Sequence, residues 1–281
     1  LRLSEFEEII PPRLISSSCE LAADPFIVSV ENSLYVFFEV IDDDSQFIGV
    51  AKSSDENGYE YLGSCLQSSE VRFSHPFIHG SDNGFYMIPE QRTYQKKPTN
   101  YLYHTSEHQF PFGWDRKASL FETGLEDIND RILIQSNGVY YLLYGDGGRR
   151  LRCRFATSLD GDWRPHPSSP FLIGKNLATR PGGGFLRTTN GLLVFLQAEG
   201  DLGYGERLRP LLIEEITVNK VEGVLAEQPI QAGVINQSLT KAHHLSVSED
   251  DLETHVVMDG YDEHRFSIWT TALSHDSSSN S

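Results

Sequence analysis

The sequence predicts an all-β protein with the fold of a five-bladed β-propeller. A strand–turn–strand pattern occurs four times, at 22–40, 74–90, 129–146 and 180–197. An internal repeat of about fifty residues built from strands is typical of a propeller, in which each repeat forms one blade. No stretch shows the 3.6-residue period of an amphipathic helix, and the chain of 281 residues has room for five such repeats.

The first strands follow from alternating apolar and polar residues between turn signals. A strand from Phe6 to Ile10 ends at Pro11-Pro12 and is expected to complete the last blade. Blade one, about 20–70, adds strands at 47–53 and 59–66 to its opening pair. Blade two, about 71–122, adds a third strand at 100–106 and a fourth after Trp114, with a polar loop at 92–100.

The remaining blades are less regular. Blade three, about 123–172, closes through a turn that ends at Trp163. Blade four, about 173–240, has later strands within 207–220, and its Gly-rich insert 198–207 is expected to be an exposed loop. Blade five, about 241–273, has strands at 243–248, 253–260 and 265–273. One domain therefore covers 1–273, and the Ser-rich tail 274–281 is expected to be disordered.

The net charge of the chain argues against two classes of binding partner. The formal net charge of −17 argues against nucleic acid and anionic membrane surfaces, because phosphate groups are bound by clustered Lys and Arg. No run of eighteen apolar residues occurs, so membrane insertion is not expected in this segment. The expected partner is an oligosaccharide or a glycoconjugate with neutral sugars.

The sequence contains few signals for targeting or covalent processing. The chain starts at Leu1 without a signal-like apolar segment, so we interpret it as an excised or processed domain. The triplet Asn236-Gln237-Ser238 is an N-glycosylation sequon and is compatible with a secretory or extracellular location. Three widely spaced cysteines offer no metal-ligand spacing, and they are either buried free thiols or include one disulfide: Cys19, Cys65 and Cys153.

Polar residues recur where each innermost strand begins. The first strand of each propeller blade lines the central channel, so these residues converge whatever their separation in sequence. The convergent set is Asp24, His75, Asp130, Arg180 and His243 or His244. Asp before Pro also forms turns, and 180–184 can be a simple loop, but five polar groups at equivalent places favour a ligand site in the funnel.

Carboxyl groups in such a funnel suit cleavage of a glycosidic bond, which needs one protonated and one ionised carboxyl. Asp24 and Asp130 are the inner carboxylates, and Glu39 and Glu90 are reached from second strands. Glu90 is favoured over Glu39 as the acid, because Pro89 indicates a strand end at the funnel mouth.

The adjacent histidines suggest a further role. His243 or His244 can hold a water or a structural cation in the central channel, although a buried histidine is more often simply hydrogen-bonded. No other cofactor is expected.

Several motifs carry a family resemblance: ADPF at 23–26, YMIPE at 86–90, the segment 158–170 around LDGDW, the RPGG stretch, and the closing HH and VVMDG. In order and spacing they resemble the five-bladed propellers of the arabinanase, levansucrase and invertase superfamily. Within it, the match over about 20–262 is closest to the N-terminal propeller of glucosamine inositolphosphorylceramide transferases.

The resemblance implies roles for individual residues. Asp24 matches the superfamily's base or nucleophile, while the position of its second Asp carries His75. The acid is a Glu near the start of blade three, where this chain offers Glu126, Asp127 and Asp130 without a clean match. In the closer relatives the propeller accompanies a separate glycosyltransferase domain.

Three hypotheses follow. The first is a glycoside hydrolase-like propeller that binds and cleaves a neutral glycan, with Asp24 as base or nucleophile and Glu90 or Asp130 as acid. His75, Arg180, His243, His244 and Glu39 would then contact the substrate. The second is a glycan-binding or scaffolding propeller without catalysis, tied to a glycosyltransferase. The third is a protein-interaction propeller that uses its outer loops.

Overall fold

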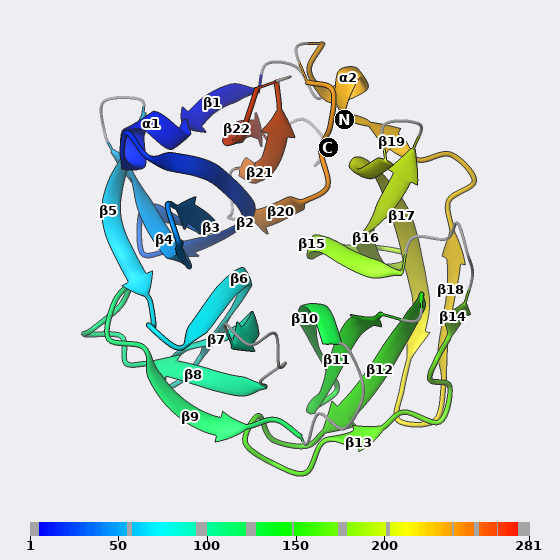
Figure 1. Ribbon diagram of the computed structural model, residues 1–281. Helices are drawn as coiled ribbons and strands as arrows, with labels where there is room; N and C mark the ends of the chain where they lie inside the picture. Colours follow the sequence, from blue (N-terminus) through cyan, green and yellow to red (C-terminus); the bar gives the residue numbers. More distant parts are fainter. Residues whose placement is uncertain are drawn as a thin grey trace, which may run out of the picture.

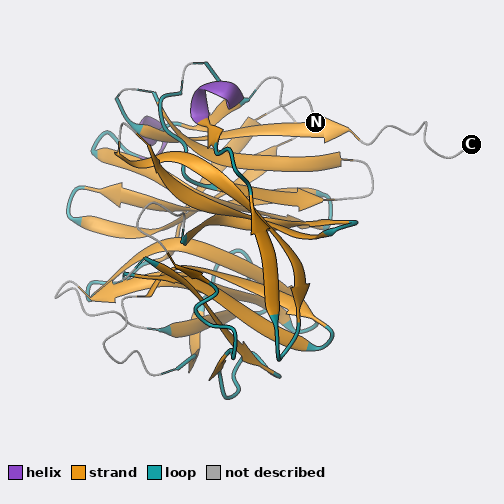
Figure 2. Cartoon of the chain, turned by 90° about the vertical axis from the view of Figure 1, so that its right-hand side faces the viewer, coloured by secondary structure: helices purple, strands orange, loops and turns teal. Residues whose placement is uncertain are grey.

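The computed structural model describes residues 6–54, 58–93, 100–121, 128–147, 149–173, 179–200, 203–237, 239–249, 253–262 and 264–274. Its strands are grouped around a central axis, with the first strand of each group nearest that axis (Figure 1). Within these ranges the helices are two single turns, α1 (Pro12–Ile15) and α2 (Ala232–Ile235). The side view in Figure 2 shows a molecule made almost wholly of strands, which confirms the all-β prediction.

The first two sheets are four-stranded antiparallel meanders. One contains β2 (Cys19–Val30), β3 (Ser33–Asp42), β4 (Ser45–Ser54) and β5 (Gly58–Leu66). The next contains β6 (Val71–Ser81), β7 (Gly84–Thr93), β8 (Tyr101–Thr105) and β9 (Asp115–Ser119). Of the polar loop predicted at 92–100, residues 94–99 lie outside the described ranges.

The third sheet has three long strands and two short ones. It contains β10 (Ile128–Ser136), β11 (Val139–Asp146), β12 (Arg150–Ala156), β13 (Arg164–Pro165) and β14 (Leu172–Ile173). Trp163 precedes β13, and its indole N–H donates to the Leu159 carbonyl over 3.1 Å. Trp114 stands before β9 in the same way and donates to the Pro111 carbonyl over 2.8 Å. Each tryptophan thus fixes the turn that leads into an outer strand.

The fourth sheet is nine-stranded and joins two meanders. One contains β15 (Arg180–Thr188), β16 (Gly191–Gly200), β17 (Gly203–Ile216) and β18 (Val221–Leu225), with β19 (Ile230–Gln231) on β17. The other contains β20 (Leu245–Glu249), β21 (Glu253–Tyr261), β22 (Phe266–Ser274) and β1 (Glu7–Ile10). A single parallel pair, Gly183 with Leu245, connects them. The described strands therefore form four hydrogen-bonded sheets, and five separate sheets are not observed.

The prediction of an exposed loop at 198–207 is wrong. β16 and β17 continue through this segment, with Ala198 paired to Arg207 and Gly200 paired to Gly203. The side chains of Ala198 and Glu206 are buried, so the Gly-rich stretch extends a hairpin that packs against the body of the protein. Glycines often indicate a loop, but cross-strand pairing and burial decide the structure here.

The core lies between neighbouring sheets. Fully buried Phe37, Ile48, Phe73 and Met87 belong to one cluster that joins the first two sheets, as burial of apolar faces requires. The three cysteines are free thiols, with Cys153 buried and Cys19 and Cys65 partly buried, so the disulfide alternative is wrong. Among the described residues, no helix has the length and hydrophobicity that a bilayer crossing requires.

Candidate functional site

A bulge at the start of three inner strands directs polar side chains to the axis. The pairing of β2 with β3, of β6 with β7 and of β10 with β11 each shifts register there. The residues at these shifts are Asp24, His75 and Asp130, with φ of 52°, 47° and 44°. Asp and His tolerate this left-handed conformation better than most residues, and a bulge re-aims the side chain it carries. The repeated polar residue in the sequence is therefore a bulge residue.

In the fourth inner strand, β15, the bulge lies at a different place from the other three. In β15 the register shifts between Pro181 and Phe185, and the left-handed residue is Gly183, with φ of 123°. Arg180 instead pairs with Gln197, as Ala23 pairs with Glu39 in the first sheet. Arg180 thus lies three positions before the left-handed Gly183, whereas Asp24 is itself the left-handed residue of β2.

The second strands present the residues opposite these bulges. Glu39, Glu90 and Gln197 pair with Ala23, Ser74 and Arg180. The third sheet departs from this, because Tyr144 pairs with Arg131, beyond the bulge. Glu39 and Glu90 therefore occupy equivalent positions beside the shift, whereas Gln197 lies one pair further from it and Tyr144 lies beyond it.

A cavity of about 440 Å³ opens at this end of the channel and is called the funnel below. Its lining consists of Leu21, Ala23, Asp24, Glu39, Ser74, Asp130, Arg180, Lys241, His243 and Phe266. The predicted site residues Asp24, Glu39, Asp130, Arg180 and His243 thus meet in one space. His75, His244 and Glu90 are buried behind this lining. The alternatives Glu126 and Asp127 lie outside the described residues.

Asp24 lies at the base of the funnel among histidines. Its Oδ1 is 3.3 Å from Nδ1 of His244 and 3.4 Å from Nε2 of His243. Burial raises the pKa of the Asp24 carboxyl to about 7, against the lowering effect of the His243 charge.

Glu39 is the carboxyl nearest to Asp24. Burial, the Asp24 charge and a hydrogen bond with the Asp24 side chain raise the pKa of Glu39 well above its ordinary value. Gln46 donates its amide N–H to Glu39 Oε1 over 2.6 Å. The two carboxyls are therefore coupled, and the negative charge of one disfavours ionisation of the other.

Asp130 is held by cations and amides. Arg180 donates through Nε to Asp130 Oδ2, and Gln197 donates to the same oxygen over 3.1 Å. The other oxygen, Oδ1, is 3.5 Å from Nδ1 of His75. Both hydrogen bonds to the Asp130 carboxylate are therefore made to Oδ2, and Oδ1 only approaches the His75 ring.

Glu90 is buried and does not belong to the lining of the funnel. Its Oε1 accepts a hydrogen bond from Arg92 Nε, and its Oε2 accepts one from the Asp130 backbone N–H, each over 3.0 Å. Burial and the Asp130 charge raise the pKa of Glu90. This glutamate joins the second blade to the bulge of the third.

Asp259 was not singled out from the sequence, although it organises this end of the channel. It is fully buried in β21 and accepts backbone N–H groups of His243 and His244, each over 3.0 Å, and that of Asp24 over 3.2 Å. Its Oδ2 is also 2.9 Å from Nδ1 of His243. The motif VVMDG contains this residue, but its place in a second strand gave no signal of convergence.

Asp259 and His243 form a buried ion pair. Burial acts to lower the pKa of His243, but the Asp259 carboxylate outweighs it and raises that pKa to about 9. Burial likewise acts to raise the pKa of Asp259, and the His243 charge lowers it to about 2. Both partners are therefore charged at neutral pH.

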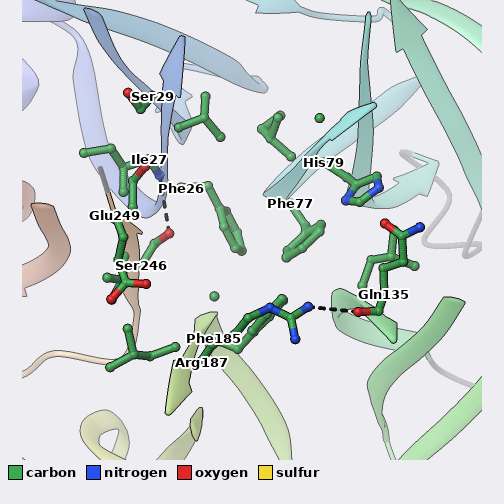
Figure 3. A pocket seen from close by; sticks show the side chains of 18 of the residues that line it. Phe26, Ile27, Ser29, Phe77, His79, Gln135, Phe185, Arg187, Ser246 and Glu249 are labelled. Carbon is green, nitrogen blue, oxygen red and sulfur yellow. Dashed lines mark hydrogen bonds between the residues drawn. The ribbon is translucent and has the colours of Figure 1, made fainter. Parts of the chain in front are cut away.

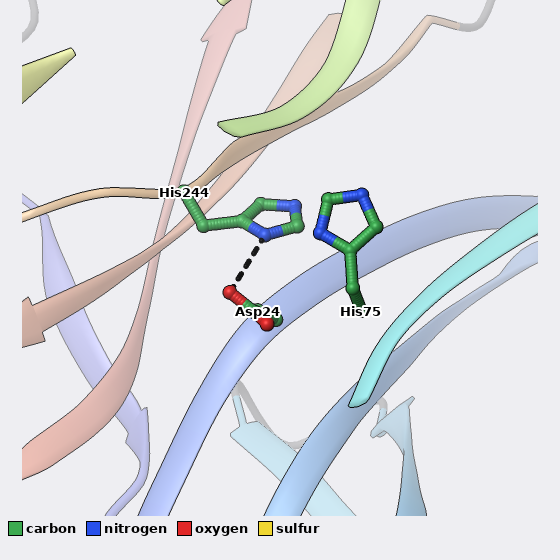
Figure 4. Close-up of side chains that lie close together, drawn as sticks. All are labelled: Asp24, His75 and His244. Atoms are coloured by element: carbon green, nitrogen blue, oxygen red, sulfur yellow. Dashed lines mark hydrogen bonds and ion pairs between the residues drawn. The ribbon is translucent and has the colours of Figure 1, made fainter. Parts of the chain in front are cut away.

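Among the described residues, two groups of side chains can hold a metal ion. Asp24, His75 and His244 lie close together, as do Asp24, His243 and Asp259, and in each group one ligand atom per residue lies within 4.8 Å of the others. Figure 4 shows the first group, with the His75 and His244 rings side by side above the Asp24 carboxyl. Burial lowers the pKa of both imidazoles well below the ordinary value, so both rings are neutral.

A second cavity of about 470 Å³ lies at the opposite end of the same channel (Figure 3). Phe26, Phe77 and Phe185 line it, together with the rim residues Arg187 and Glu249. Phe26 separates the two ends, because its ring contacts those of His75 and His244 at centroid distances of 5.0 and 4.5 Å.

The sequence of the chain matches one known family over most of its length. The profile of the family described as "Glucosamine inositolphosphorylceramide transferase 1, N-terminal" matches residues 13–261. The chain belongs to this family. The protein of that name from Oryza sativa subsp. indica is 29% identical over 223 residues, covering 75% of this chain and 28% of the rice protein. The Arabidopsis thaliana protein is 26% identical over 240 residues, covering 81% and 30%. The chain thus spans less than a third of these family members.

Solved structures show which fold the family has. The catalytic domain of the Coprinopsis cinerea GH62 α-L-arabinofuranosidase superposes with a TM-score of 0.72 at 14% identity, covering 97% of this chain and 96% of that one. A thermostable family-43 glycoside hydrolase gives 0.67 at 16% identity, covering 96% and 94%. The Podospora anserina α-L-arabinofuranosidase, solved with cellotriose, gives 0.65 at 12%, covering 96% and 95%. These likenesses confirm a β-propeller of the arabinanase type.

Proposed function

We propose that the protein is a five-bladed propeller whose funnel binds a neutral glycan, free or as part of a glycoconjugate. The blade count is supported by the nine-stranded sheet, whose two meanders share only the pair Gly183–Leu245. Each meander has its own innermost strand, β15 or β20, beside the axis (Figure 1). Counted separately, they add two blades to the other three sheets.

The observation that carries the proposal is an open funnel in which Asp130, Arg180 and His243 are already paired within the protein. Asp130 is paired with Arg180, and His243 with Asp259, at the base of a cavity of about 440 Å³. Paired charges exert little net attraction on an ionic ligand, but their remaining lone pairs and N–H groups can bind hydroxyl groups. Phe266 lines the same cavity and offers an apolar face for a sugar ring.

Hydrolysis is the second candidate, because Asp24, Glu39 and Asp130 all line the funnel. A glycosidase needs two carboxyl groups roughly 5 to 9.5 Å apart with separate tasks. Asp24 and Glu39 instead share a hydrogen bond, and Asp130 is bound to Arg180. The contacts also favour Glu39 over Glu90 as the proton-bearing group, since Glu90 bonds to Arg92 behind the funnel. Binding is therefore better supported than cleavage.

Binding is tested on a panel of immobilised neutral oligosaccharides, with positive ligands measured by calorimetry. We expect Phe266→Ala to weaken binding at least about tenfold, which corresponds to about 1.4 kcal/mol. Phe185→Ala is the matched control, because Phe185 lines the opposite cavity. No binding to any glycan, or equal affinity for both variants, would contradict the proposal.

Cleavage is tested with aryl glycosides, pentofuranosides first, and with Asp24→Asn as the control variant. Turnover that disappears in Asp24→Asn would establish hydrolysis. Binding without turnover would establish a glycan-binding unit.

We further propose that this unit works beside a glycosyltransferase domain. The support is that family members are named as transferases and are more than three times as long as the matched segment. Co-purification of this chain with a separately expressed transferase domain from a longer family member tests the association, and no co-purification at micromolar concentrations would argue against it.

A further inference from the structure

Three buried side chains from distant parts of the sequence meet on the channel axis. Asp24 comes from β2, His75 from β6, and His244 directly precedes β20 (Figure 4). One ligand atom from each lies within 4.8 Å of the others, and Asp24 Oδ1 is 3.3 Å from His244 Nδ1. The two imidazole rings are 5.1 Å apart between centroids.

Three of the four imidazole nitrogens meet hydrogen-bond geometry with no atom of the described residues, although the His75 ring lies close to the Arg131 backbone. Both nitrogens of His75 and Nε2 of His244 are in this state, although neither side chain has solvent exposure. The 3.5 Å approach of Asp130 Oδ1 to His75 Nδ1 does not meet hydrogen-bond geometry. Each buried polar group without a partner costs about 1–3 kcal/mol. Such groups in folded proteins usually mark something that binds to them.

The donor set specifies the chemistry of that partner. Two imidazole nitrogens and one carboxylate oxygen suit a borderline transition ion such as Zn²⁺, whereas Ca²⁺ takes six to eight oxygens. Ligand bonds of about 2.0–2.1 Å in a tetrahedral site hold neighbouring donors about 3.3 Å apart. The separation of Asp24 Oδ1 from His244 Nδ1 matches this spacing.

The backbone around these ligands is already fixed. Asp259 accepts the backbone N–H of both Asp24 and His244, which holds two of the three ligands in place. The other group, Asp24 with His243 and Asp259, is a weaker candidate because His243 and Asp259 are paired with each other.

We propose that Asp24, His75 and His244 bind one divalent transition-metal ion of the zinc class at the base of the funnel. Three protein ligands leave one tetrahedral position for water or for a hydroxyl group. His75 is essential to this assignment, because only two ligands remain in this group without its nitrogen. The proposal goes beyond glycan binding and does not depend on it, since the ion can be measured without any sugar.

The experiment titrates chelator-treated protein with Co²⁺ and then Zn²⁺, followed by calorimetry and by the visible absorption of Co²⁺. We expect one equivalent to bind, Zn²⁺ to displace Co²⁺, and excess Ca²⁺ to leave the Co²⁺ spectrum unchanged. His75→Gln and His244→Gln should each lower the affinity at least about a hundredfold, since even indirect contacts to a metal are worth 10–100-fold. His79→Gln should bind normally, because His79 lies on the same strand but lines the opposite cavity.

If the variants do not fold, a second measurement on the wild-type protein still tests the proposal. In the wild-type protein, Zn²⁺ should shift the ¹⁵N resonances of two imidazoles and leave the His79 ring unchanged. Absence of stoichiometric binding, wild-type affinity in both ligand variants, or displacement of Co²⁺ by Ca²⁺ would each overturn the proposal. Unshifted imidazole resonances at saturating Zn²⁺ would overturn it as well.

Discussion

The two ends of the central channel are built from the same inner strands but differ in chemistry. The funnel, of about 440 Å³, is lined by Asp24, Asp130 and Arg180, while the lining of the opposite cavity, of about 470 Å³, mixes four phenylalanines with aliphatic and polar side chains. The strands that supply both linings include β2, β6 and β15. Cavity size therefore does not distinguish the ends. Part of the difference comes from single bulged residues within the inner strands, because these direct Asp24 and Asp130 into the funnel lining.

The comparison also shows how each end is held together. At the apolar end, Phe26 and Phe77 pack edge to face at 5.4 Å and need no specific partner. At the funnel end, a buried carboxylate, Asp259, binds the backbone on both sides of the closure between the first and last blades. The funnel should thus be the more sensitive end to loss of one polar group.

The largest effect is expected for Asp259→Ala. The substitution leaves the backbone N–H groups of Asp24, His243 and His244 without their acceptor and the His243 charge without its partner. Breaking such a buried pair costs about 3–5 kcal/mol of unfolding free energy. Denaturant unfolding measures this cost. Asp115→Ala, at an exposed position of β9, is the control and should change stability by less than about 0.5 kcal/mol.

Gly183→Ala tests the bulge that differs from the others. A Cβ at this position would lie 1.7 Å from the Leu245 carbonyl oxygen, at the one pair that joins the two meanders of the nine-stranded sheet. We expect a loss of more than about 3 kcal/mol in unfolding free energy, because backbone strain alone contributes about 1–3 kcal/mol.

Gly138→Ala is the matched control for Gly183→Ala. Gly138 also has positive φ, 74°, but a Cβ there meets nothing within 4 Å. Gly138→Ala should therefore lower the unfolding free energy only by the backbone strain, about 1 kcal/mol. Equal losses for the two variants would show that the close approach to Leu245 is unimportant.

The sequence predicted the repeat and the convergence at the axis because both depend on local pattern. Asp24, His75 and Asp130 occupy the same place in each repeat, and each is a left-handed bulge residue. Other features depend on partners distant in the chain. Asp259 bonds to the Asp24 backbone across 235 positions, and no periodic signal marks such a contact.

The assignment of the proton-bearing group to Glu39 or Glu90 also depends on contacts that the sequence does not reveal. Both glutamates oppose a bulge in equivalent strands, so position alone does not separate them. Their neighbours do, because Gln46 leaves Glu39 beside Asp24, whereas Arg92 holds Glu90 behind the funnel. Similarly, the Arg180-Pro181 pair looked equivalent to Asp24-Pro25, but the glycines that follow moved the bulge to Gly183.

The pH dependence of the unfolding free energy, compared between the wild type and Glu90→Gln, is a further test of the polar end of the channel. Burial raises the pKa of Glu90 in the folded state, so the folded protein binds the proton more tightly than the unfolded chain does. Its contribution is fully favourable below the unfolded pKa of about 4.3 and is lost as pH rises through the folded pKa. In that window the unfolding free energy of the wild type should fall with pH more steeply than that of Glu90→Gln, by up to about 1.4 kcal/mol per pH unit.

Denaturant unfolding at a series of pH values above 4 measures this difference. Glu60→Gln, on the exposed face of β5, is the control and should keep the wild-type slope. Parallel curves for the wild type and Glu90→Gln would show that this glutamate titrates normally.

The smallest effect is expected for Arg187→Ala at the rim of the opposite cavity. Arg187 donates through Nη2 to the Gln135 carbonyl over 2.8 Å and lies over the Phe185 ring at 5.5 Å, but it is exposed. Water replaces both contacts at little cost, so stability should change by no more than about 0.5 kcal/mol, and glycan affinity should stay the same. Calorimetry with the tightest glycan found for the wild type measures the affinity. A tenfold loss would place ligand contacts at the apolar end, and the assignment of binding to the funnel would then be wrong.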